Sequence, residues 1–300
     1  MNIELFNKTE EIIKSIIKTM DAVYVEASNK SPYKKQLLSD LRKGYAKVRG
    51  LYIPYKAISH RVLFEEYALV HFQGFIGFYK NLFSEIDSYF TEFAFRTLIE
   101  VGIEITHIIF SKDIKEKEKK RFILNILLTD FGILASRDIK FLAYLERLLT
   151  EEEVLLEDNE KKNFIEMIKS IKDKNLKTLD KSLEIAMKYS SDAQLILYKK
   201  TKTPDFIDIN KINILHSWFS HLIHGDIFLV DSIFKEYKNP YQHKLRTHYL
   251  LLYVGCDFLY YIQDSTDVDS LKDSINQIIK DFKNIEPNIK AFWNKYLKLK

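Results

Sequence analysis

Glycine and proline are scarce in this chain: its 300 residues include eight Gly and five Pro. Turns between many short strands depend on these residue types, so their scarcity favours long helices. Apolar side chains also recur at spacings of three and four, as in Ile12, Ile16 and Met20, which places them on one helical face. With 46% hydrophobic residues the chain can offset the entropy cost of ordering. The sequence therefore predicts an all-α fold, a multi-helix bundle.

The helical pattern predicts one domain over residues 1–300, with its core in 57–265. Thr150 and Glu153 match a capping box that would begin an amphipathic helix ending near Asp173. A charged helical hairpin at 150–200 is expected to be peripheral. After an N-terminal helix and a second helix at about 37–45, helices are expected at 57–85, 88–110, 122–134, 139–149, 209–224, 241–263, 268–282 and 287–297.

Composition and charge indicate an intracellular protein without a membrane span. The first 18 residues lack the apolar core and the cleavage site of a secretion signal. The most apolar run, 249–262, is too short to cross a bilayer and predicts a buried core helix that carries the single cysteine, Cys256. A net charge of +4 falls short of the basic stripe that binds phosphates. We expect a cytoplasmic protein with a solvated basic surface.

A first polar cluster lies in the expected helix 88–110. Arg96, Glu100, Glu104 and His107 follow one another at spacings of four, four and three, so they share one face of an otherwise apolar helix. Buried charges must be paired, and this face is therefore expected to meet polar groups of another helix. Alternatively, Arg96 and Glu100 form an ordinary ion pair at a partly exposed seam.

Glu104 and His107 also form the Glu-x-x-His motif of di-iron helical bundles. Such sites combine two copies of this motif, and the chain contains no second copy. We therefore expect no metal ion and no cofactor.

A second polar cluster ends the expected helix 209–224. Ser220, His221 and His224 lie three and four residues apart, and Asp226 follows Gly225. The histidines and the carboxylate are of the types that bind zinc or act as acid and base. Alternatively, the histidines interact only with the negative end of the helix dipole. We expect this helix to pack against the helix that carries Arg96.

Asp257 is a third polar residue of interest, because it lies within the apolar run 249–262. An isolated carboxylate would be costly to bury there. A buried donor is therefore expected beside it: Arg96, a histidine or a tyrosine hydroxyl.

Two of these motifs carry a family resemblance. Arg96-Thr-Leu-Ile-Glu100, followed far downstream by Ser220-His221-Leu-Ile-His224, resembles an uncharacterised all-helical bacterial family that is similar to HEPN domains. The resemblance covers about 60–265 and implies a HEPN-like core with additional helices, in which Arg96, Glu100 and His224 form a polar centre. HEPN ribonucleases carry Arg-x(4 to 6)-His, and no arginine of this chain has a histidine at that spacing.

Three functions are consistent with these patterns. The first is a HEPN-like binding or effector module in a toxin or phage-defence setting, with RNA or a protein as partner and a homodimer as one assembly. The second is an RNA-cleaving or metal-dependent hydrolase that uses Arg96, Glu100, His221 and His224. The third is a structural oligomerisation protein in which these residues pair with one another. Access of solvent to the cluster separates the first function from the second, because catalysis needs substrate access and a structural network does not.

Overall fold

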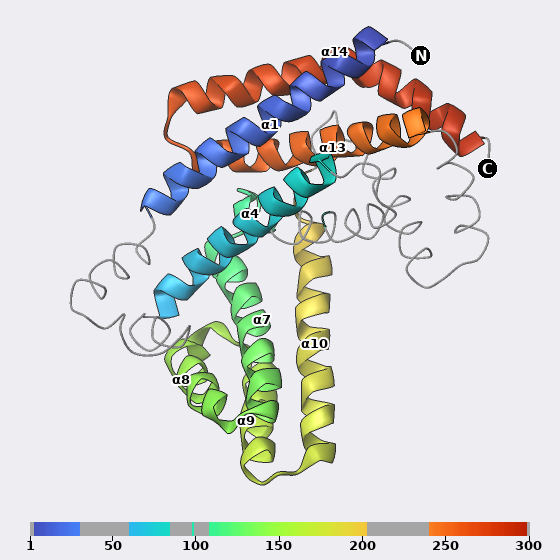
Figure 1. Ribbon diagram of the computed structural model, residues 1–300. Coiled ribbons are helices and arrows are strands. Elements are labelled where there is room, and N and C mark those ends of the chain that lie inside the picture. The colour runs from blue at the N-terminus through green and yellow to red at the C-terminus, as the bar shows by residue number, and fades with distance from the viewer. Residues whose placement is uncertain (1–2, 31–59, 85–97, 99–107, 203–239, 299–300) are drawn as a thin grey trace, which may run out of the picture. The chain divides into compact units, whose positions relative to one another are not determined.

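The computed structural model describes residues 3–30, 60–84, 98, 108–202 and 240–298 (Figure 1). All regular secondary structure in these ranges is helical, which confirms the all-α multi-helix fold. The helices are α1 (Ile3–Lys30), α4 (His60–Ser84), α6 (Ile108–Phe110), α7 (Glu116–Arg137), α8 (Leu142–Glu152), α9 (Asp158–Lys172), α10 (Leu176–Tyr198), α13 (Pro240–Ile262) and α14 (Asp269–Lys298), with 3-10 turns at Ile139–Phe141, Glu153–Leu155 and Gln263–Ser265.

The chain forms two compact units. Unit 1 contains α1, residues 69–84 of α4, α13 and α14, whereas unit 2 contains residues 60–68 of α4 and α7 to α10. The expected domain boundaries stay a prediction. No helix in the described ranges is long and apolar enough to cross a membrane.

Helix α13 lies at the centre of unit 1. Every residue from Tyr249 to Leu259 is buried, including Cys256. A helix that is apolar around its whole circumference needs neighbours on all sides, and α1, α4 and α14 supply them. The prediction of a buried core helix at 249–262 is thereby confirmed.

Aromatic packing joins α4 to α13. The ring of Phe75 stacks on that of Phe258, with 4.0 Å between centroids and 9° between planes. The hydroxyl of Tyr79 donates to the carbonyl oxygen of Leu251 at 2.6 Å. Gly255 lies against this tyrosine, and a Cβ atom at its position would be 2.9 Å from Tyr79 Cζ. The Tyr79 side chain can therefore lie against the backbone of α13 because position 255 carries no side chain.

Helices α1 and α14 run antiparallel along one side of unit 1 (Figure 1). Near the end of α1, the Glu26 carboxylate accepts hydrogen bonds from the hydroxyl of Thr266 and, at 3.2 Å, from the backbone N–H of Asp267. These two residues directly precede α14. At the opposite end, Lys8 of α1 and Asp281 of α14 line the same groove.

Unit 2 is held together by a buried carboxylate between α7 and α9. Glu160 is 3% exposed and accepts hydrogen bonds from the Arg121 guanidinium, at 3.0 Å from both Nε and Nη2, and from Asn125 Nδ2 at 2.9 Å. Helix α10 packs along both α9 and α7, and α8 packs against α7. Paired donors thus offset the desolvation of the Glu160 charge.

The expected capping box at Thr150 and Glu153 is wrong. Thr150 lies inside α8, where its hydroxyl donates to the carbonyl oxygen of Glu146 at 2.8 Å. The capping box instead consists of Glu157 and Glu160 at the start of α9. Threonine can satisfy its hydroxyl within a helix, so the Thr-x-x-Glu pattern alone does not define a helix start.

The expected break between 282 and 287 is also wrong, because α14 continues through Pro287. Ile285 and Glu286 directly before the proline are buried, and the Glu286 carboxylate accepts a hydrogen bond from the Tyr253 hydroxyl at 3.4 Å. These core contacts hold the turn before Pro287 in helical geometry. The proline therefore removes one N–H donor and introduces a local ring clash, but it does not end the helix.

Candidate functional site

The candidate site residues named from the sequence lie outside the described ranges: Arg96, Glu100, Glu104, His107, His221 and His224. Their roles, and the packing of the Arg96 helix on the His224 helix, stay predictions. Leu98 and Ile108, near the first polar cluster in the sequence, are fully buried. Within the described ranges, no group of three or more His, Cys, Asp or Glu side chains is placed to hold a metal ion.

Asp257 is buried, as its apolar neighbours in the sequence indicate, and the residue is 7% exposed. Burial and the adjacent Asp257 charge together raise the pKa of Cys256 well above its ordinary value. This thiol therefore stays protonated and unreactive at neutral pH. The expected donor beside Asp257 stays a prediction.

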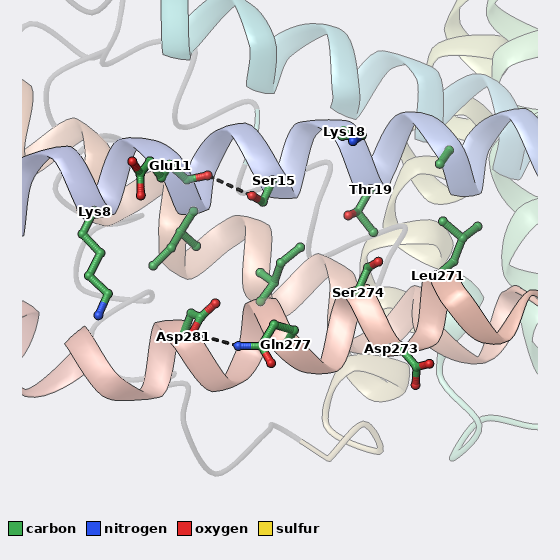
Figure 2. A pocket seen from close by; sticks show the side chains of 13 residues that line it. Lys8, Glu11, Ser15, Lys18, Thr19, Leu271, Asp273, Ser274, Gln277 and Asp281 are labelled. Atoms are coloured by element: carbon green, nitrogen blue, oxygen red, sulfur yellow. Dashed lines mark hydrogen bonds between the residues drawn. The ribbon is translucent and has the colours of Figure 1, made fainter.

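The structure shows a groove between α1 and α14 that the sequence did not predict (Figure 2). Its volume is about 720 Å³. Its base contains the buried Ile12 and Ile278, and exposed charged side chains stand along its rim. The lining residues are Lys8, Glu11, Ile12, Ser15, Lys18, Thr19, Ala22, Leu271, Asp273, Ser274, Gln277, Ile278 and Asp281.

Small side chains keep the groove open. Ser15, Thr19 and Ala22 succeed one another on the groove side of α1 at spacings of four and three. Thr19 and Ser274 point toward one another from the two helices, and neither is long enough to fill the space between them (Figure 2). The groove therefore follows from residue size on facing helical surfaces.

Polar side chains in the groove form hydrogen bonds within their own helices. The Ser15 hydroxyl donates to the carbonyl oxygen of Glu11 at 3.0 Å, and the Ser274 hydroxyl donates to that of Ser270 at 2.8 Å. In α14 the Gln277 amide donates to the Asp281 carboxylate at 3.0 Å. Among the lining side chains, all of which are described, no hydrogen bond or ion pair joins α1 to α14. The two walls are therefore open to a ligand.

The two walls of the groove differ in charge. The α1 wall carries Lys8, Lys18 and Glu11, whereas the α14 wall carries Asp273 and Asp281. One wall is thus net positive and the other is net negative.

His248 of α13 is a second polar feature of unit 1. It is fully buried, and its ring stacks on Phe6 with 4.8 Å between centroids. Its Nδ1 lies 3.4 Å from the hydroxyl oxygen of Thr9, and that hydroxyl donates its single hydrogen to the Phe6 carbonyl oxygen at 2.6 Å. Nδ1 must therefore be the donor to Thr9, and Nε2 carries a bare lone pair. Within the described part of the chain, Nε2 has no hydrogen-bond partner.

The neutral state of His248 follows from its surroundings. Burial lowers its pKa to about 4, with further lowering by the Lys244 and Lys14 charges and an opposing effect of Glu10. Solvent does not reach the ring, so a substrate could not reach it in this arrangement. His248 therefore serves packing between α1 and α13.

Sequence reasoning missed both features because each looked ordinary. Ser15 is an exposed residue of an amphipathic helix, Thr19 is a small polar residue on its buried face, and His248 directly precedes the apolar run. The one signal available was the row of small residues along α1, which is typical of a surface that another helix approaches closely.

The motifs that resemble the HEPN-like family lie at 96–100 and 220–224, and apart from Leu98 their residues are outside the described ranges. The described helices confirm the coarser expectation of an all-helical protein. No protein-family model, no curated protein and no solved structure matches this chain.

Proposed function

We propose that this chain is a HEPN-like binding module that acts as an effector by holding a protein partner in the α1–α14 groove. The HEPN-like assignment, the cytoplasmic location and the toxin or phage-defence setting are part of the proposal. The HEPN-like assignment and the setting rest on the motifs at 96–100 and 220–224 and on the family that these motifs resemble, whereas the cytoplasmic location rests on composition and the single cysteine.

The proposal rests on one observation. The groove lies between α1 and α14, and no hydrogen bond or ion pair among its described lining side chains joins the two helices. Its volume of about 720 Å³ falls within the range of ligand sites in proteins. A buried apolar base of Ile12 and Ile278 beneath a charged rim is the usual arrangement of a protein interface, where apolar contacts are shielded by polar ones.

The charges of the groove favour a protein over RNA. Two lysines line it against three carboxylates, those of Glu11, Asp273 and Asp281. An RNA backbone needs clustered cations to replace its counterions, and carboxylates in the same groove would repel it.

The chemistry of the groove favours binding over catalysis. A serine nucleophile needs a base that removes its proton, but the Ser15 and Ser274 hydroxyls donate to backbone carbonyls of their own helices. A histidine is the usual base for a serine nucleophile, and His248 is fully buried inside unit 1. The described residues of the groove therefore offer a recognition surface.

Site-specific photo-crosslinking in producing cells tests this function. A photoreactive residue placed at Ser274, in the groove, should yield an adduct with one defined protein. The same residue at Lys181, which is exposed on α10 of unit 2, should not yield that adduct. Ser15→Trp, which fills the groove, should abolish the Ser274 adduct while the thermal melt stays unchanged.

Three results would contradict the proposed function. These are equal adducts from Ser274 and Lys181, an adduct that survives Ser15→Trp, and an adduct with RNA in place of protein. The last result would instead favour the RNA-directed alternative.

A further inference from the structure

We infer that the occupant of the α1–α14 groove is a single amphipathic α-helix of the partner, with a basic flank facing α14 and an acidic flank facing α1. This inference rests on the proposed function and names the class of ligand that the same groove takes.

The backbone of the walls favours a helical occupant over an extended one. Both walls are α-helices, whose N–H and C=O groups are used within the helix except at the ends. An extended peptide would find no sheet edge with which to pair its own backbone, and its polar groups would be buried without partners. A helix satisfies its own backbone and needs only side-chain contacts.

The dimensions of the groove suit a short helix. Its lining along α1 extends from Lys8 to Ala22, which corresponds to about 21 Å or four turns at the usual helical rise. Ser15, Thr19 and Ala22 allow a close approach because their side chains are short. An apolar seam at helical spacing would contact Ile12 and Ile278 at the base.

Charge complementarity sets the two flanks. Lys8 and Lys18 on α1 would face acidic side chains, and Asp273 and Asp281 on α14 would face basic ones. The two aspartates are eight residues apart, so basic residues spaced by seven or eight on the partner would meet both. Glu11 is the one carboxylate on the α1 wall, and it would face a position without an acid.

Synthetic peptides of about 18 residues test the inference although the partner is unidentified. All carry the same leucine seam: one has a Glu flank and a Lys flank, one has Lys on both flanks, and one has Glu on both. A fourth repeats the first with two central prolines that prevent a helix. In fluorescence anisotropy with the full chain, the peptide with opposite flanks should bind about tenfold more tightly than each of the others.

Charge reversal of one wall supplies the matched protein variants. Asp273→Lys with Asp281→Lys makes both walls basic and should transfer the preference to the peptide with Glu on both flanks. Asp180→Lys with Asp192→Lys changes two exposed acids of α10 in unit 2 and should keep the original preference. Thermal melts of both double variants check that each is folded.

The inference is overturned if all helical peptides bind equally, if none binds, if the proline peptide binds as well as its parent, or if light scattering shows that the groove holds a second copy of this chain. These results are separable from the proposed function. A protein adduct from Ser274 together with failed peptides refutes the helical occupant alone, whereas the absence of that adduct refutes the binding function itself.

Discussion

At the scale of single residues, His248 links pH to stability through its buried ring. Its pKa is about 4 in the folded protein against 6.5 ordinarily, so the folded state favours the neutral form. The contribution of His248 to the free energy of unfolding is fully present above pH 6.5. It is lost as the pH falls toward 4, because the unfolded chain takes up the proton first. The loss is at most about 3 kcal/mol.

Urea unfolding from about pH 7 down to pH 4 should therefore show a steeper loss of stability for the native chain than for His248→Phe. Phenylalanine keeps the stacking on Phe6 but cannot titrate. Carboxylates such as Glu10 titrate in both proteins, so the difference between the two curves isolates His248. Parallel curves would show that the histidine is protonated without cost in the folded state.

The Thr9 contact to His248 illustrates what the sequence could not predict at this scale. The two residues are 239 positions apart, and the protonated nitrogen is fixed only when the Thr9 hydroxyl is known to donate to Phe6. Periodicity assigned Tyr249 and its successors to the core, but it carries no information on which helix supplies the neighbour of a given side chain.

At the scale of helices, the approach of α4 to α13 depends on Gly255. An alanine there would place its Cβ 2.9 Å from both Tyr79 Cζ and Ile16 Cγ2, and the tyrosine is held by its bond to Leu251. Gly255→Ala should therefore lower the free energy of unfolding by about 2 kcal/mol, although alanine is the better helix former.

Gly74→Ala in α4 is the matched control for Gly255→Ala. A Cβ atom at position 74 meets nothing within 4 Å, so this change should raise stability by up to about 1 kcal/mol. Calorimetric melts of both variants measure the two changes in stability. Equal gains at the two positions would refute the close packing of α13 on Tyr79.

The junction of α7 with α9 depends on the Glu160 charge. Glu160→Gln keeps the shape of the side chain but weakens its bonds with Arg121 and Asn125, and it should cost about 2 kcal/mol of unfolding free energy. Glu157→Gln removes an exposed charge that pairs with the same arginine and should cost about 0.5 kcal/mol or less. Urea unfolding compares the two variants, and equal costs would mean that burial of Glu160 adds nothing.

Amphipathic periodicity predicted most of the described helices because the apolar residues of each buried face recur at helical spacing within that segment. It failed at Pro287, where contacts of Ile285 with the core outweigh the local cost of proline, and at Thr150, whose hydroxyl bonds within α8. Amphipathic periodicity also did not predict the groove between α1 and α14. Ser15 and Ser274 form one site only because α1 and α14 lie side by side, and neither helix alone differs from an ordinary surface helix.

At the scale of the whole molecule, both units combine separate stretches of the chain. Unit 2 joins residues 60–68 of α4 to residues 111–201, whereas unit 1 joins α1 to α13 and α14, more than 200 residues later in the sequence. The contact of Glu26 with Thr266 spans 240 positions. The sequence predicted α1 and α13 and divided α14 into two helices, but it held no local signal that α1 and α14 meet.

This connectivity sets an order of events during synthesis on the ribosome. Helix α1 emerges before α13 and α14, and residues of α14 that share its core, such as Ile275 and Phe282, are translated more than 200 residues later. At ordinary elongation rates that interval is roughly 10 to 50 s. Throughout it, Ile12, Ile13 and Ile16 lack those neighbours in the core that α14 supplies. The core around α1 is therefore complete only after α14 has been made.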